Sequence, residues 1–158
     1  MSSDVVLAFK SGLVGELERL RKHLDDLAAP LTEEQFWRKP IEPGNSVGHL
    51  VLHLTGNLQH FAGARLGNTG YVRDREKEFT NPTPPTKAQA LSRLDEAVAV
   101  FRQVILGLTD EQLLAPHPDA HLGPTVAAAL GALVSHFALH RGQISYISRL
   151  VAPQEKKA

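Results

Sequence analysis

Four long segments of the sequence carry apolar residues three and four positions apart, which is the spacing of an amphipathic helix. They cover roughly residues 3–28, 46–66, 87–106 and 125–151, and none of them shows the alternation of a strand. The pattern therefore predicts an all-α protein. The chain length of 158 residues is typical of one domain, so we expect a single domain over residues 1–158.

The segments between the helices predict how the helices connect. The pieces LTEEQFW (31–37) and LTDEQLL (108–114) each open with a Thr-x-x-Gln capping box, which predicts two short helices. Residues 67–85 lack helical periodicity and are too long for a tight turn. When extended they span roughly twice the length of a 20-residue helix, so they can run back along the bundle. We expect a four-helix bundle with one long crossover between the second and third long helices.

Composition excludes several classes of function. The 17 Lys and Arg residues balance the 17 Asp and Glu residues, so the chain lacks the basic surface of a nucleic-acid-binding protein. Anionic membranes are excluded as partners for the same reason. There is no cysteine, so a metal site would have to use nitrogen and oxygen donors. With no signal-peptide pattern and no apolar run of membrane-spanning length, we expect a cytoplasmic location.

Charge is distributed unevenly among the four helices. Residues 43–72 contain only Arg65, and residues 120–154 contain only Arg141 and Arg149. The second and fourth helices are therefore predicted to be the buried pair. Because they are apolar on nearly every side, we expect them to face a second copy of the chain as well as the core, in a homodimer.

Histidines on these two helices are the candidate ligands of a metal ion. His136 and His140 are four residues apart in SHFALHRGQI, so their imidazoles can converge on one ion, although such a pair can also be incidental or structural. The second helix offers His49, His53 and His60 as a third ligand. These three lie away from the apolar centre of their helix, as a solvated face would, and spacing alone does not choose among them.

Missing carboxylates exclude two familiar metal sites. No Glu lies three residues before any His, as the ferritin-like di-iron site requires, and HExxH is also absent. What remains is a mononuclear site with three neutral nitrogen donors and open positions for water or substrate. We interpret the other histidines, His23, His117 and His121, as surface residues.

The sequence resembles the DinB/YfiT-like superfamily of small bacterial four-helix bundles with a metal site. The resemblance runs along the chain through LTEEQFWRKP, NSVGHLVLHLTGNLQHF, RDREKEF, LTDEQLLAPH and SHFALHRGQI. It implies up-down-down-up topology, frequent homodimers and a divalent ion such as zinc, nickel or iron. Matched residue by residue, it implies that His53, His136 and His140 are the ligands.

Residues around these three histidines receive supporting roles. His49 departs from the family's pattern, and it is either an alternative ligand or a group behind the ligands. Asn57 and Gln143 lie one turn beyond ligand positions, where they either orient imidazoles or make packing contacts.

A general base would have to come from outside the two histidine helices. Such carboxylates occur in the crossover. Arg73 and Arg75 of the same segment are available to an anionic substrate. The simpler interpretation is that all these side chains belong to a solvated charged loop. These carboxylates are Asp74, Glu76 and Glu78.

Several proteins of the family look like transferases or hydrolases that use low-molecular-weight thiols. A divalent ion deprotonates a bound thiol, so no protein cysteine would be needed as the nucleophile. The same open position could hold water for hydrolysis of a small molecule. The resemblance thus implies a thiol transferase, a metal-dependent hydrolase, or a metal-binding or interaction bundle without catalysis.

Overall fold

The structure is a computed structural model that describes residues 3–152, so the outermost residues of the predicted domain, 1–2 and 153–158, lie outside the described part. Long helices account for most of it, and the described residues contain no strand. The long helices are α1 (Ser3–Ala28), α3 (Val47–Leu58), α6 (Lys87–Gly107) and α8 (Val126–Val151). Helix α3 continues into a π-helical turn η1 (Gln59–Ala64) and a last turn α4 (Arg65–Gly67). The predicted all-α class is confirmed.

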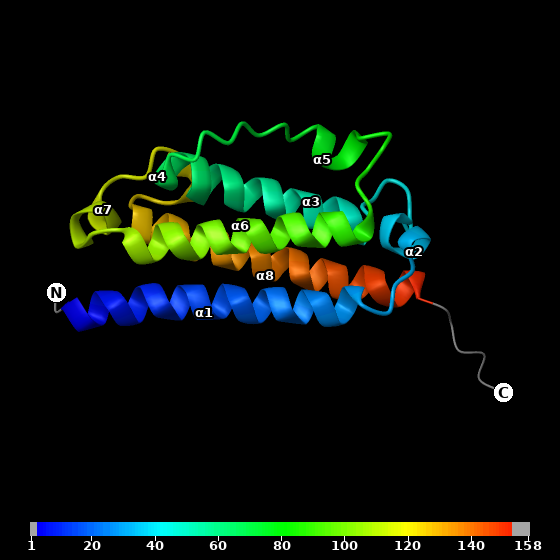
Figure 1. Cartoon of the computed structure of the whole chain (residues 1–158), viewed down its shortest axis with the longest axis horizontal. Helices are drawn as coiled ribbons and strands as arrows, with labels where there is room; N and C mark the ends of the chain where they lie inside the picture. The colour runs from blue at the N-terminus through cyan, green and yellow to red at the C-terminus, as the bar shows by residue number, and fades with distance from the viewer. Residues whose placement is uncertain (1–2, 153–158) are drawn as a thin grey trace.

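The four long helices form a bundle in which α1 and α3 each pack against both α6 and α8. Helices α1 and α8 run in one direction, and α3 and α6 run in the opposite direction (Figure 1). The parallel arrangement of α3 and α6 requires the chain to return along the bundle between them. It does so through residues 68–86, which include the short helix α5 (Lys77–Thr80). The predicted crossover and the up-down-down-up topology are therefore confirmed.

Short helices lie at both ends of the bundle, with α2 (Glu33–Trp37) at one end and α7 (Asp110–Leu114) at the other (Figure 1). Both begin with the predicted capping box. Thr32 Oγ1 accepts a hydrogen bond from the backbone N–H of Gln35 at 3.2 Å, and Thr109 Oγ1 accepts one from Gln112 at 3.2 Å. These bonds satisfy N–H groups that the first turn of a helix leaves unpaired. A 3₁₀ turn, η2 (Ala120–Leu122), precedes α8.

The core lies between the four long helices. Leu24 of α1, Leu54 of α3, Phe101 of α6 and Phe137 of α8 are each at most 1 % exposed. Burying a side chain of this size contributes about 1.5–3 kcal/mol to the free energy of unfolding. The helices are thus held in register by apolar packing, which fixes the level at which polar side chains of α3 and α8 face each other.

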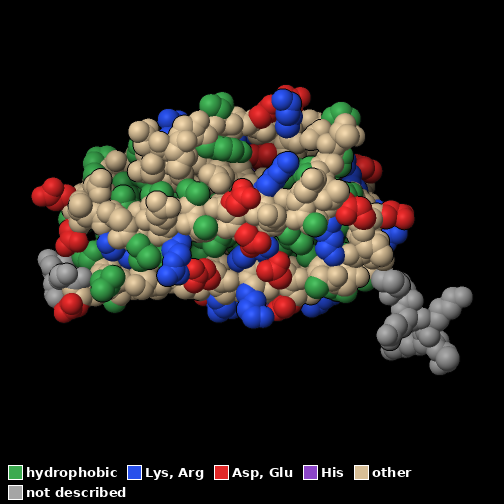
Figure 2. Space-filling view, viewed as in Figure 1, with side chains coloured by type: hydrophobic (Ala, Val, Ile, Leu, Met, Phe, Trp, Pro, Cys, Tyr) green, Lys and Arg blue, Asp and Glu red, His purple; other side chains and the backbone are tan. Residues whose placement is uncertain are grey.

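The surface explains the uneven charge of the sequence. Charged side chains are spread over α1 and α6 on the face that Figure 2 shows. The outer flank of α3 carries no charge where the chain's own crossover packs on it through α5, and Leu52 and Thr55 line a pocket together with Tyr71 and Val72 of the crossover. Among the described residues, no helix has both the length and the apolar character needed to cross a membrane.

Candidate metal centre

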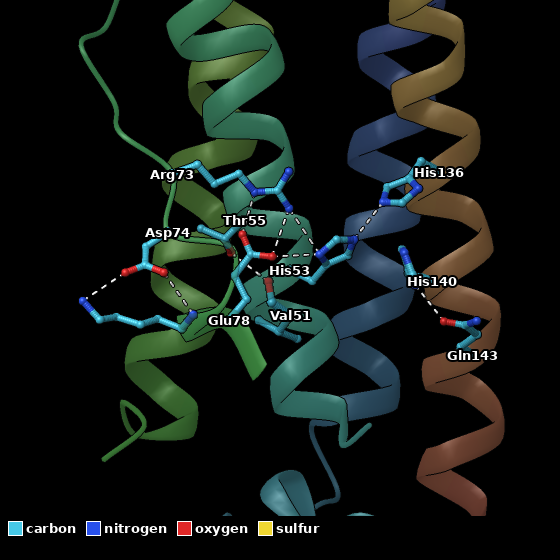
Figure 3. Close-up of polar contacts among 10 residues, drawn as sticks. Val51, His53, Thr55, Arg73, Asp74, Glu78, His136, His140 and Gln143 are labelled. Atoms are coloured by element: carbon cyan, nitrogen blue, oxygen red, sulfur yellow. Dashed lines mark hydrogen bonds and ion pairs between the residues drawn. The ribbon is translucent and has the colours of Figure 1, made fainter. Parts of the chain in front are cut away.

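Helices α3 and α8 bring His53, His136 and His140 together near the middle of the bundle (Figure 3). One ring nitrogen of each residue lies within 4.8 Å of those of the other two. The Nε2 atoms of His53 and His136 are 3.1 Å apart. The ring centroid of His140 is 4.8 Å from that of His53 and 4.4 Å from that of His136. The three imidazoles therefore surround one small space between two antiparallel helices.

The surroundings favour the neutral form of two of these imidazoles. Burial, together with smaller electrostatic contributions from His140, His53 and Arg73, lowers the pKa of His136 from 6.5 to about 4. Burial also lowers the pKa of His140, against a smaller opposing effect of its hydrogen bond to Gln143. Both rings are thus neutral near pH 7, and a neutral imidazole has a lone pair that a metal ion can bind.

Gln143 fixes the orientation of His140. The amide oxygen Oε1 of Gln143 accepts a hydrogen bond from His140 Nδ1 at 2.7 Å. In the neutral ring the proton then lies on Nδ1, so Nε2 carries the lone pair. This Nε2 is buried and has no hydrogen-bond partner among the described residues. A divalent ion would satisfy it, and three imidazole nitrogens are donors that suit zinc, nickel and iron.

Glu78 of α5 holds His53 from the side opposite to the cluster. Its carboxylate is buried, and Oε2 accepts a hydrogen bond from His53 Nδ1 at 2.8 Å (Figure 3). A carboxylate only accepts, so the proton lies on Nδ1 and the lone pair of Nε2 faces His136. A carboxylate behind a metal-binding histidine fixes the ring and raises its basicity.

Arg73 completes this contact from the crossover. Its Nε donates to Glu78 Oε1 at 2.7 Å and its Nη2 donates to Oε2 at 2.9 Å, which is a bidentate ion pair. Arg73 Nη2 also lies 3.2 Å from His53 Nδ1, because both nitrogens donate to the same oxygen, Oε2 of Glu78. Burial would raise the pKa of Glu78, but the hydrogen bonds from His53 and Arg73 outweigh it and lower the pKa, so the carboxylate is ionised.

The interpretation of the crossover as a solvated charged loop is therefore wrong for Glu78 and Arg73. It is correct for Asp74, Glu76 and Arg75, whose side chains are exposed. Figure 3 shows Asp74 directed away from the histidines, toward the lysine side chain with which it pairs. The sequence shows no periodicity in the crossover, so it gave no register from which to tell the two buried side chains from the exposed ones.

Gly56 of α3 makes room for the carboxylate of Glu78. A Cβ atom at this position would overlap Glu78 Oε1 and would lie 3.3 Å from Arg73 Nε. Gly56 was not among the predicted site residues. Its signal was a glycine inside a helical pattern, which costs about 1 kcal/mol relative to alanine and often indicates a close approach by another group.

Other predicted site residues lie outside the cluster. His49 takes part in the cap of α3, because its Nδ1 accepts from the backbone N–H of Ser46 at 3.2 Å. Its ring packs near Trp37 and Phe79. Asn57 is buried one turn after His53, and its Oδ1 has no hydrogen-bond partner in the described part of the chain. Of the three supporting residues, Gln143 makes a hydrogen bond to an imidazole of the cluster.

The remaining histidines differ in exposure. His117 was expected at the surface, but it is 4 % exposed, because its Nδ1 accepts from the backbone N–H of Asp119 at 3.0 Å in a turn before α8. His121 is exposed as expected, and His23 lies half-buried on α1. His60 lies in η1 with its ring against Phe61.

The chain is similar to one protein family and to a solved structure. The model of the DinB superfamily matches residues 16–144 of this chain. A search of curated proteins found no significant match. A solved structure of YfiT from Bacillus subtilis matches with a TM-score of 0.70 and 23% sequence identity, over 94% of this chain and 89% of that one. That protein is described as a probable metal-dependent hydrolase with an unusual four-helix bundle topology.

Proposed function

The chain belongs to the DinB superfamily, and we propose that it is a metal-dependent hydrolase of small molecules whose divalent ion is held by His53, His136 and His140. One observation carries the proposal: three imidazoles surround one space, and Nε2 of His140 is buried there with no partner among the described residues. The description of YfiT as a probable metal-dependent hydrolase supports the choice of reaction.

The chain's own residues have distinct tasks in this proposal. The three Nε2 atoms bind the ion, which can be zinc, nickel or iron. A divalent ion in such a site lowers the pKa of a coordinated water toward about 7 and polarises a substrate carbonyl. Glu78 keeps the proton of His53 on Nδ1, and Gln143 does the same for His140, so both rings present lone pairs to the ion.

Thiol transfer is the second candidate function, and it is favoured by the lack of a free carboxylate at the cluster among the described residues. The cluster found in the described residues contains histidines alone. Both oxygens of Glu78 are engaged by Arg73 and His53, so Glu78 is not available as a general base. A thiol needs less help than water, because coordination to a divalent ion deprotonates it outright. A transferase using a low-molecular-weight thiol would therefore need no added base.

Metal analysis of protein purified without a histidine tag tests the proposed ligands. We expect about one divalent ion per chain, and we expect His140→Ala to lose most of it, because two imidazoles remain. His23→Ala is the matched control, since His23 lies on α1 outside the cluster. A metal content of zero in the unaltered protein, or equal content in both variants, would contradict the assignment.

Turnover assays separate the candidate functions. The metal-loaded protein is incubated with activated esters and amides, and separately with small thiols plus a chlorinated aromatic electrophile. Hydrolysis without thiol consumption supports the hydrolase. Thiol consumption without hydrolysis supports the transferase, and stoichiometric metal without either reaction supports a non-catalytic metal-binding bundle.

The predicted homodimer and cytoplasmic location are proposals as well. The crossover packs on α3, so the partner surface would lie mainly on α8, where Leu150 is 41% exposed. Sedimentation velocity over a range of concentrations measures the oligomeric state. Fractionation of cells that express the protein measures the location.

A further inference from the structure

A pocket lies between the start of α3 and the second half of α8. Its volume of about 580 Å³ is within the range of small-molecule sites, which is roughly 300–1,000 Å³. We call it the Gly142 pocket. Its lining residues are Asn45, Leu50, Leu139, Gly142, Gln143, Tyr146 and Ile147.

The lining of the Gly142 pocket is uncharged and largely apolar. It contains no Lys, Arg, Asp or Glu among the residues that the structure describes. Leu139 and Tyr146 are more than half exposed at its edge. Covering such surface is favourable by about 25 cal/mol per Å² of apolar area. A charged group would lose hydration there without gaining a partner charge, so the lining selects an uncharged, apolar ligand.

The Gly142 pocket is linked to the metal centre by one shared residue, Gln143. This residue lines the pocket and also accepts the hydrogen bond from His140 Nδ1 at 2.7 Å. Leu50 of the lining lies three residues before His53 on α3, and Gln143 lies three residues after His140 on α8. Both are about one helical turn from a histidine of the cluster. A ligand in the pocket would therefore have one end close to the imidazoles.

We propose that the Gly142 pocket binds an uncharged hydrocarbon part of the substrate and so places the reacting group at the metal centre. The substrate class is then an ester or amide with an aliphatic or aromatic group on one side of the bond. The identity of the reaction rests on the proposed function. Binding of an apolar molecule in the pocket does not, because no metal ligand lines it.

Gly142 permits a test that leaves the fold intact. A Cβ atom at Gly142 would have no heavy atom within 4 Å, so the side chain of Gly142→Leu begins in open space and adds bulk at the pocket. Gly131→Leu is the matched control, because Gly131 lies on the same helix, its Cβ also meets nothing within 4 Å, and it does not line the pocket. Leucine favours helix over glycine, so both variants should unfold no more readily than the unaltered protein.

The probe is the uncharged naphthalene dye prodan, titrated into metal-free protein and followed by fluorescence. We expect Gly142→Leu to raise the Kd for the dye at least about tenfold and Gly131→Leu to leave it unchanged. On metal-loaded protein, we expect kcat/KM for p-nitrophenyl esters to rise about fourfold per added methylene of the acyl chain. We expect Gly142→Leu to abolish this rise.

Equal dye binding by Gly142→Leu and the unaltered protein would overturn the proposal, because the dye would then be bound elsewhere. No dye binding by the unaltered protein would also overturn it. A dimer that does not bind the dye and dissociates in Gly142→Leu would show that a second copy occupies the pocket. Dye binding lost in Gly142→Leu, together with no hydrolysis at any metal loading, would support the pocket and contradict the proposed reaction.

Discussion

Glu78 is the side chain that gives His53 a defined role. It lies 25 residues after His53 in the sequence, yet its carboxylate is 2.8 Å from the Nδ1 atom of that ring. Arg73 holds the carboxylate in a bidentate ion pair, so the imidazole is positioned by two residues of the crossover. A buried ion pair is not by itself evidence of added stability, because desolvation offsets much of the attraction. Its value here is the fixed tautomer and orientation of His53.

Replacing Glu78 by Gln tests this positioning role. The substitution keeps the shape of the side chain but removes the charge that favours the Nδ1 proton, so we expect zinc affinity to fall by about 10–100-fold. It also leaves Arg73 without a buried counter-charge, so we expect some loss of thermal stability. Competition with a zinc chelator measures the affinity.

Glu76→Gln is the matched control, because Glu76 lies in the same crossover and is exposed. If the zinc affinity of Glu78→Asp lies between those of Glu78→Gln and the unaltered protein, this would support orientation of His53 by a carboxylate. Unchanged zinc affinity in Glu78→Gln would show that the cluster does not depend on this hydrogen bond.

At the scale of elements, the site depends on how closely the crossover approaches α3. Helix α5 packs on α3, and Glu78 reaches His53 past Gly56, where any side chain would overlap the carboxylate. Helices α3 and α5, which are distant in the sequence, can thus pack closely because Gly56 has no side chain. The crossover connects parallel helices and also supplies the groups behind a candidate ligand.

Gly56→Ala should displace the carboxylate without unfolding the bundle. The atom that its Cβ would meet is the end of a flexible Glu side chain, and alanine favours helix over glycine by about 1 kcal/mol. We therefore expect zinc affinity to fall, by no more than in Glu78→Gln, while thermal stability changes little.

Gly131→Ala provides the control, because a Cβ there meets nothing within 4 Å. In the double variant with Glu78→Gln, we expect the loss to equal that of Glu78→Gln alone, since both changes remove the same contact. Additive losses would show that Gly56 acts on the cluster by another route.

Acid should destabilise the whole molecule through His136, which is half-buried in the cluster. The pKa of His136 is lowered from 6.5 to about 4. Between these values, the unfolded chain binds a proton at His136 that the folded protein does not bind. The contribution of His136 to the free energy of unfolding is therefore fully present above about pH 6.5 and is lost as the pH falls. Below about pH 4 this contribution no longer changes.

For metal-free protein, we expect the free energy of unfolding to fall by on the order of 2 kcal/mol between pH 7.5 and 4.5. Urea unfolding at a series of pH values measures this change. His136→Gln should reduce the slope, whereas His23→Gln on the outer helix should keep it. An identical slope in His136→Gln would show that burial of this imidazole does not set the acid response.

The sequence by itself determined the class and course of the chain, because helix periodicity, capping boxes and crossover length are local properties. The helices at 3–28 and 87–106 and the Thr32 and Thr109 caps were predictable for this reason. The sequence also indicated His136 and His140 as candidate ligands, because one helix sets their spacing. The choice of His53 as the third ligand rested on family resemblance.

Only the tertiary structure decided what surrounds these histidines. The position of Glu78 and Arg73 depends on how an aperiodic crossover folds over α3, and no local pattern encodes that contact. The burial of His117 likewise depends on a turn that packs before α8. We expected a second copy of the chain to cover the uncharged flank of α3. The fold shows that its own crossover covers that flank, because the parallel order of α3 and α6 requires the chain to return along the bundle.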